Sequence, residues 1–294
     1  MKTLREVLKD ADTRRVAIGH FNISDYGTLR GIFDGAREFS KNLAIPLPIL
    51  IGVSEGEREF LGVKQAAALI KSLRETYEYP VFINADHTHS LDKVREAAEA
   101  GFDEVLYDGS KLPMEENIKT TKQAVEIVKS INPEIIVEGE IGYIGSSSEI
   151  VAQRPEGIQL STPQEAVQFV KETNVDVLAP AVGNMHGLLA DMATGKIHKK
   201  LDIDLIIQIK EACKIFMTLH GGSGTADEDF AAAAKNGMTI IHVSSELRLA
   251  WRRGMEQSLG KDPNEIAPYK LLGQSVDNIK KIVEDRIKLF GGIQ

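Results

Sequence analysis

The sequence predicts a single α/β domain over residues 1–294, folded as a closed (β/α)8 TIM barrel. Short apolar runs rich in β-branched residues alternate with longer amphipathic segments along the whole chain. This alternation favours parallel strands joined by helices. There are eight such runs, and 294 residues suit a one-domain barrel of this kind.

The eight strands are expected to be short. In chain order they lie at residues 15–21, 46–53, 81–86, 104–109, 135–141, 175–183, 216–222 and 238–244. Two of the helices between them have recognisable ends. In SLDKVREAAEAG, Ser90 is a candidate N-cap and Gly101 ends the helix. In STPQEAVQFVKET, Ser161 or Thr162 is the cap and Pro163 the first helical residue.

The longest irregular stretch, residues 142–160, is rich in glycine and serine and follows the fifth predicted strand. A loop of this length in a compact domain is often a functional element. The last helix, within residues 276–292, has an apolar stripe and is expected to cover the barrel or form a subunit contact.

Composition and charge narrow the function. With 43% hydrophobic and 27% charged residues the chain should be globular. A net charge of −8 argues against a nucleic-acid surface. The single cysteine, Cys213, excludes an intrachain disulfide and a cysteine-type zinc cluster. The charged N-terminus and the lack of long apolar segments predict a cytoplasmic protein without a membrane partner.

Four histidines lie at or near the carboxyl ends of predicted strands: His87, His186, His220 and His242. In a parallel barrel the carboxyl ends of the strands share one rim, where catalytic groups gather. Neutral imidazoles suit zinc, and three protein ligands leave coordination positions open for a substrate. The sequence therefore predicts a metal site at this rim. The remaining histidines, in strand one, at a helix start and in a basic stretch, are weaker candidates: His20, His89 and His198.

Acidic and glycine-rich segments accompany these histidines. Asp86 precedes His87, while Glu138 and Glu140 lie in the fifth predicted strand. The segment HGGSG, residues 220–224, offers backbone N–H groups that can hold a phosphate. A Schiff-base aldolase would need a lysine inside the barrel, and none of the eight runs contains one internally. Together these features favour metal-assisted chemistry on a phosphorylated ligand.

Six stretches, NADHTHSLD, VEGEIGYIG, LSTPQEAVQFV, VGNMHG, LHGGSG and HVSSELR, resemble the class II, metal-dependent fructose- and tagatose-bisphosphate aldolase family, in that family's order. The resemblance extends from Phe21 to the C-terminal KLFGG. It implies a zinc-dependent aldol cleavage of a ketose 1,6-bisphosphate into dihydroxyacetone phosphate and an aldehyde such as glyceraldehyde 3-phosphate. It also implies a homodimer or homotetramer, and it allows a monovalent cation, Na⁺ or K⁺, beside the phosphate.

The resemblance also assigns residues. His87, His186 and His220 would bind zinc, with Glu140 as a further metal-binding or neighbouring carboxylate. Asp86 would handle a proton at the aldol hydroxyl, and Glu149 in the 142–160 loop would be the general base. Substrate-binding positions would be Asn22, Ser54, Gly187, Gly221, Ser223, His242, Ser244, Ser245 and Arg248.

The match departs from the family pattern at His242, where the family has an asparagine that touches the substrate. An imidazole there could be a fourth metal ligand, a substitute hydrogen-bond partner or a sign of another substrate. Ser244 and Arg248 give conflicting indications of which ketose bisphosphate is the substrate. A lysine that the family often has after the second histidine is replaced by Ala190, with Lys196 as a candidate substitute.

Two other readings stay open. A metal-dependent hydrolase would use the HxH motif His87-Thr88-His89, although such enzymes normally have it on the first strand. A phosphosugar-binding barrel without catalytic activity would explain His242 and the altered loop after the fifth strand.

Overall fold

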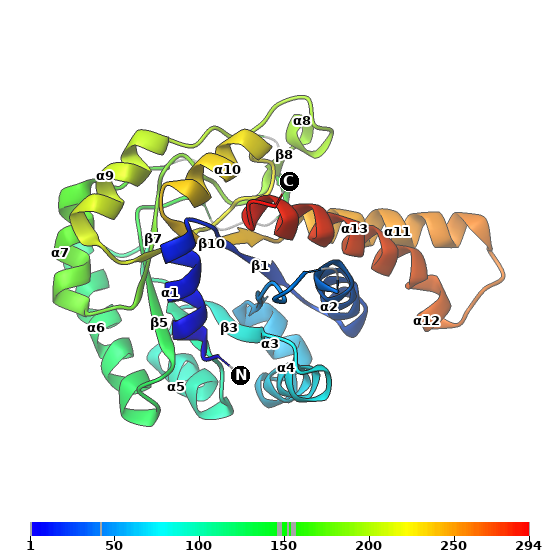
Figure 1. The fold of residues 1–294 in the computed structure, drawn as a ribbon, viewed down its shortest axis with the longest axis horizontal. Coiled ribbons are helices and arrows are strands. Elements are labelled where there is room, and N and C mark those ends of the chain that lie inside the picture. The colour runs from blue at the N-terminus through cyan, green and yellow to red at the C-terminus, as the bar shows by residue number, and fades with distance from the viewer. Residues whose placement is uncertain (1, 42, 146–148, 152, 154–156, 294) are drawn as a thin grey trace.

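The computed structural model describes residues 2–41, 43–145, 149–151, 153 and 157–293. Eight parallel strands close into a barrel in the order β1-β10-β9-β7-β5-β4-β3-β2 (Figure 1). Their bounds are β1 Ile18–Asn22, β2 Ile49–Val53, β3 Val81–Thr88, β4 Glu104–Tyr107, β5 Ile136–Ile141, β7 Val177–Pro180, β9 Phe216–Leu219 and β10 Met238–Val243. The predicted fold class, an eight-stranded TIM barrel, is confirmed.

Most strands are shorter than predicted, because the ends of the apolar runs leave the ladder. The run at 175–183, for example, forms a strand only over Val177–Pro180. β3 differs in the other direction and continues to Thr88, two residues beyond its predicted end. This extension places His87 inside the strand rather than after it.

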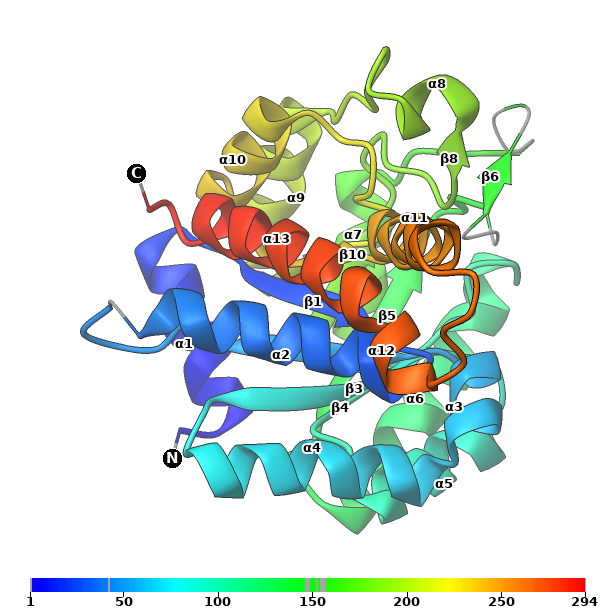
Figure 2. The same ribbon diagram turned by 90° about the vertical axis from the view of Figure 1, so that its right-hand side faces the viewer.

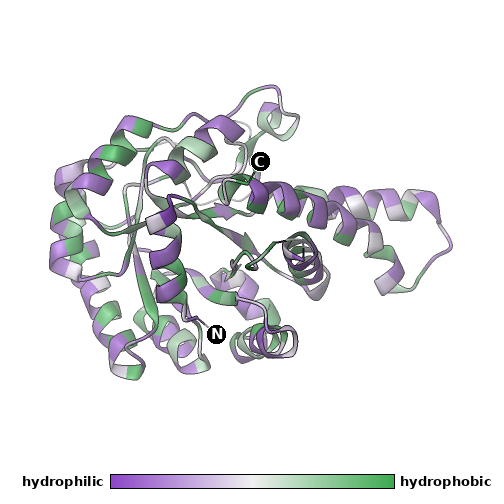
Figure 3. Cartoon of the chain, in the orientation of Figure 1, coloured by the Kyte–Doolittle hydropathy of each residue, from purple (hydrophilic) through white to green (hydrophobic). Residues whose placement is uncertain are grey.

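A ring of helices covers the barrel (Figure 2). Their bounds are α1 Leu4–Arg14, α2 Tyr26–Ser40, α3 Glu55–Leu61, α4 Val63–Tyr77, α5 Leu91–Ala100, α6 Met114–Ile131, α7 Pro163–Thr173, α8 Ala190–Ala193, α9 Ile203–Cys213, α10 Asp227–Lys235, α11 Ser245–Lys261, α12 Pro268–Leu271 and α13 Gly273–Phe290. Hydropathy follows this layering, since the strands are mainly hydrophobic and the helices carry hydrophilic residues outward (Figure 3). Two short strands, β6 Ile150–Val151 and β8 Leu188–Leu189, pair outside the barrel.

The predicted helix ends are found. The Ser90 side chain accepts the Lys93 amide at the start of α5, and Gly101 ends that helix with φ 87°. At the start of α7 the cap is Thr162, which forms a capping box with Glu165. The last predicted helix is α13, which packs against α2 and α11. α11, α12 and the start of α13 form an arm that projects from the barrel (Figure 1).

Helix α1 closes the amino-terminal end of the barrel. Its apolar side chains pack on residues from the first half of six strands, in a cluster made of Leu4, Val7, Leu8, Ala11, Ile18, Leu50, Phe82, Ile136, Val177 and Ile240. The other end of the barrel stays open and carries the polar residues described below. The apolar cluster that stabilises the fold and the polar residues of the candidate site therefore lie at opposite ends of the barrel axis.

Replacing Leu8 should test this separation. Leu8 is fully buried, so Leu8→Ala should lower the free energy of unfolding by about 2–5 kcal/mol through lost burial and a cavity. The measurement is denaturant unfolding, with the exposed Lys9→Ala as control. Zinc binding by the folded protein should stay unchanged, and a parallel loss of zinc would contradict the separation.

Candidate metal centre and active site

The open end of the barrel contains a cavity of about 480 Å³, lined by strand ends and the loops that follow them. Its walls include most of the predicted site residues: Asn22, Ser54, Asp86, His87, Glu149, His186, Gly187, Gly221, Ser223, His242, Ser244, Ser245 and Arg248. His220 lies beneath this surface with 1% of its area exposed. Residues far apart in the sequence thus meet at one rim.

A bulge at the end of β3 brings two consecutive residues to the site. Side chains alternate along a regular strand, so Asp86 and His87 would point to opposite faces. The pairing of β3 with β4 shifts register between Ala85 and Thr88, and His87 has a positive φ of 43°. The shift lets both side chains reach the cavity. A positive φ at a non-glycine residue is strained and is often retained where a site requires it.

Arg58, which sequence reasoning missed, holds this bulge in place. It is 3% exposed and donates to the carbonyl oxygens of Val53 and Asp86 and, at 2.9 Å, to the Thr88 hydroxyl. Its guanidinium therefore connects the end of β2 to both sides of the bulge. The signal available in the sequence was slight, because Arg58 lies inside the acidic segment EGEREF.

Three imidazoles converge at the centre of the rim. His87, His186 and His220 offer nitrogens that lie within 4.8 Å of one another. His87 Nε2 and His220 Nδ1 are 3.2 Å apart, close to the ~3.3 Å between two nitrogens bound tetrahedrally to one zinc ion at about 2.05 Å. Among the described residues, His186 Nε2 is buried without a hydrogen-bond partner. This donor set fits a divalent zinc-type ion.

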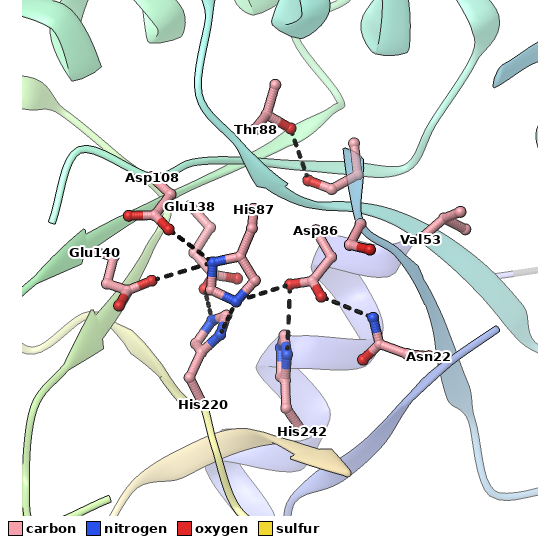
Figure 4. Close-up of polar contacts among 12 residues, drawn as sticks. Asn22, Val53, Asp86, His87, Thr88, Asp108, Glu138, Glu140, His220 and His242 are labelled. Atoms are coloured by element: carbon pink, nitrogen blue, oxygen red, sulfur yellow. Dashed lines mark hydrogen bonds and ion pairs between the residues drawn. The ribbon is translucent and has the colours of Figure 1, made fainter. Parts of the chain in front are cut away.

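Carboxylates fix which ring nitrogen each of two histidines presents. Asp108 contacts His87 Nδ1 at 2.8 Å, and Glu138 contacts His220 Nε2 at 2.6 Å (Figure 4). Each contact leaves the opposite nitrogen directed at the centre, an arrangement typical of metal-binding histidines. Asp108 was not predicted, although it follows β4 directly and the strand-end rule could have found it. Glu140 lies 3.6 Å from His87 Nδ1, on the Asp108 side of the ring.

Burial and charge set the protonation of these imidazoles. Burial lowers the pKa of His220 to about 3 and that of His186 well below its ordinary value. Burial has the same effect on His87, but the charge of Asp86 and the hydrogen bond that the ring donates to Asp108 outweigh it and raise the His87 pKa to about 10. Two imidazoles are therefore neutral, and a metal ion would displace the proton of the third.

Asp86 belongs to a buried network centred on Glu57. Asn22 Nδ2 donates to Asp86 at 2.8 Å and to Glu57 at 3.2 Å. The Ser54 hydroxyl donates to Glu57 at 2.8 Å, and Arg248 pairs with its other oxygen at 2.6 Å. Three predicted pocket residues are thus oriented by one carboxylate that sequence reasoning missed, because Glu57 lies on α3 and not at a strand end.

His242 lies beside the three converging imidazoles rather than among them. Its ring stacks on His20, with centroids 3.4 Å apart, and lies 3.9 Å from the His220 ring. His242 Nδ1 is 3.7 Å from the Asp86 carboxylate. The His20 ring fits here because it lies over Gly52 of β2, where a Cβ atom would overlap it. His20, a weak candidate in the sequence, therefore sets the position of His242.

The HGGSG segment forms a tight loop under the cavity. Gly221 has φ 57°, and a Cβ atom there would collide with the Met185 carbonyl. Ser223 Oγ accepts the Ser244 and Glu246 amides at 3.3 Å each, at the N-terminus of α11. Backbone amides, a serine hydroxyl and a helix N-terminus are the groups that bind phosphate in many proteins.

The predicted base, Glu149, is exposed and belongs to the cavity wall. Its carbonyl accepts the Leu188 amide at 2.9 Å, next to the β6–β8 pair. Residues 146–148, 152 and 154–156 of the same predicted loop lie outside the described residues. Lys196, the candidate substitute for the family lysine, is 71% exposed and pairs with Asp191 at the surface. The lysine that reaches the cavity is Lys199.

A family model described as "Fructose-bisphosphate aldolase class-II" matches residues 2–294. The fructose-bisphosphate aldolases of Geobacillus stearothermophilus and Staphylococcus aureus are 33% and 32% identical to the chain, over 98% of it and 96% of their own length. The chain belongs to the class II fructose-bisphosphate aldolase family. Members of this family are metal-dependent aldehyde-lyases, so the chain is an enzyme of this class.

Solved structures agree with this family assignment. The YdjI aldolase from Escherichia coli K12 is similar with a TM-score of 0.80 and 26% identity, over 98% of this chain and 96% of that one. A putative fructose-1,6-bisphosphate aldolase from Coccidioides immitis has the same fold, with a TM-score of 0.79 at 22% identity, over 98% of this chain and 95% of that one. In the part of this aldolase that the structure describes, no helix is long and apolar enough to cross a membrane.

Removing any of the three converging imidazoles should abolish stoichiometric zinc binding. We expect His87→Ala, His186→Ala and His220→Ala each to lose the bound ion, because two remaining ligands hold zinc weakly. Metal analysis of the purified variants is the measurement. His89→Ala is the control, since that side chain is half exposed, and zinc loss in this variant would favour the HxH alternative.

Asp108→Asn should weaken zinc binding without removing a ligand. The amide cannot accept and orient the His87 Nδ1 proton as the carboxylate does, and loss of such a partner typically costs 10–100-fold in metal affinity. Competition with a chromogenic chelator measures the change. The exposed Asp92→Asn provides a charge-matched control, and equal affinities in both variants would contradict the orienting role of Asp108.

Proposed function

We propose that this class II aldolase uses zinc to cleave a ketose 1,6-bisphosphate of the fructose or tagatose type. The products would be dihydroxyacetone phosphate and an aldehyde such as glyceraldehyde 3-phosphate. The observation that carries the proposal is the convergence of three imidazoles, that of His220 fully buried, beside Asp86 and the HGGSG loop. Family membership supports the reaction class and leaves the sugar open.

His87, His186 and His220 would hold the ion through His87 Nε2, His220 Nδ1 and a His186 nitrogen. A divalent ion there supplies positive charge that stabilises the negative charge developing on the ketone oxygen of the substrate. Glu140 lies on the far side of the His87 ring from His220 Nδ1. We therefore assign it to the neighbourhood of the metal rather than to the same three-histidine set.

Asp86 would move the proton of the hydroxyl that becomes the aldehyde. Its Oδ2 accepts from Asn22, whereas Oδ1 is buried and has no hydrogen-bond partner among the described residues. Burial opposes ionisation of Asp86, but the positive charge of His87 outweighs it and keeps the Asp86 pKa below its ordinary value. Asp86 is thus a carboxylate that can accept this proton during cleavage and return it during condensation.

Glu149 would exchange a proton with the carbon next to the ketone, where it acts as base in condensation and as acid in cleavage. Gly187, Gly221 and Ser223 would bind the phosphate of the triose half. Arg248, Asn22, Ser54, Ser244 and Ser245 line the same cavity and would position the rest of the sugar. His242 Nδ1 faces Asp86, which favours a hydrogen-bonding role near the reacting hydroxyl over direct zinc ligation.

A homodimer or homotetramer in the cytoplasm remains the expected state. Support for an oligomer comes from the arm, where Ile266 and Tyr269 are 86% and 76% exposed. Large apolar side chains exposed together at a tip are often covered by another subunit.

The reaction is tested with zinc-loaded protein and fructose or tagatose bisphosphate, by coupled detection of triose phosphate. Glu149→Gln should lower kcat by about 10²–10⁴-fold with unchanged zinc content, because it removes an acid–base group only. Lys200→Gln serves as control, since this exposed residue contributes nothing to the cavity wall.

Two outcomes would contradict the proposal. Cleavage that persists after complete chelation would exclude the metal mechanism. Tight binding of dihydroxyacetone phosphate without cleavage or proton exchange at its carbon would favour a binding protein instead.

A further inference from the structure

Lys199 is a buried cation between the two loops that carry His186 and His220. It is 3% exposed, yet it belongs to the cavity wall. Its Nζ donates to the carbonyl oxygens of Met185 at 2.7 Å, Gly187 at 2.8 Å and Gly221 at 2.9 Å. An ammonium group has three hydrogens, and three acceptors use all of them.

The backbone of Lys199 holds the side chain in this position. The Lys199 amide donates to the Gly224 carbonyl at 2.8 Å, and the residue forms an isolated parallel bridge with Thr225. The chain therefore runs alongside the HGGSG loop, and the side chain passes under it. Lys199 is thus tied to the predicted phosphate loop at both its backbone and its ammonium group.

The acceptors around Nζ are neutral carbonyls. Among the described residues no carboxylate forms an ion pair with it, and Glu246 acts only as a more distant charge. Burial lowers the Lys199 pKa to about 7, with Glu246 opposing the shift. A neutral amine could donate only two of the three hydrogen bonds, so the three carbonyl contacts fit the ammonium form. That form has no lone pair, which excludes Lys199 as a Schiff-base nucleophile in this arrangement.

Converging backbone carbonyls are also the ligands that proteins use for K⁺. We propose that the Lys199 ammonium is a built-in monovalent cation, which occupies the carbonyl cage of Met185, Gly187 and Gly221. It fixes the two histidine loops relative to each other and gives the phosphate pocket its positive charge. A free Na⁺ or K⁺, which the family resemblance allows beside the phosphate, does not fit here because the cage is filled.

The proposal rests on the proposed function only for the identity of the natural anion. Inorganic phosphate is therefore the probe, and its binding is measured by calorimetry on the zinc-loaded full chain. Wild-type protein should bind phosphate equally well in choline chloride, KCl and NH₄Cl of equal ionic strength, about 0.1 M. Because turnover is not needed, failure of the aldolase proposal would leave this measurement intact.

Lys199→Met removes the charge and keeps an apolar stem of similar length. In choline chloride its phosphate affinity should fall on the order of tenfold or more, since a charge-assisted site loses its cation. KCl or NH₄Cl should restore most of this loss, because the vacated carbonyls can bind a small cation. Lys196→Met is the matched control and should behave as wild type, because Lys196 is exposed.

Three results would overturn the proposal: stimulation of wild-type binding by K⁺, unchanged affinity in Lys199→Met, or a loss that no small cation restores. If Lys199→Met fails to fold, Lys199→Gln, which keeps a polar amide, is measured in the same way. Phosphate binding by the wild-type protein in choline chloride and in KCl tests the filled cage independently of either variant, because K⁺ should not change it.

Discussion

The hydrogen bonds between His87 and Asp108 and between His220 and Glu138 determine what the open end of this barrel can bind. Each carboxylate occupies one ring nitrogen and thereby turns the other towards a common point. The two presented nitrogens are 3.2 Å apart, so once His87 gives up its proton both lone pairs face the same point, where a shared cation would satisfy them. Burial then keeps His220 neutral and available.

Several buried polar side chains that lie away from the reacting atoms hold the three histidines and the cavity wall in place. Arg58 supports the bulge that lets Asp86 and His87 face the same cavity. Glu57 orients Asn22 and Ser54 in the cavity wall. Lys199 joins the loops that carry the other two histidines. The barrel provides a common rim, and these buried polar contacts convert that rim into a site with defined distances.

Local patterns were sufficient to predict the barrel, because each strand and helix has its own apolar period and caps. The strand-end rule likewise predicts from the sequence alone that the separate histidines meet at one rim. It could not reveal Lys199, which in the sequence is part of a basic stretch that resembles a solvated surface. Its burial depends on how one loop passes under another. Glu57 was missed and His20 ranked as a weak candidate for the same reason, since their roles arise from tertiary contacts.

Anomalous diffraction at the zinc edge from crystals of the zinc-loaded protein tests the central claim most directly. The account predicts one strong peak about 2.0–2.1 Å from His87 Nε2, His220 Nδ1 and a His186 nitrogen, with a coordination position open to the cavity. A peak bound by His20, Asp86 and His242, with the three other imidazoles left without metal, would contradict it.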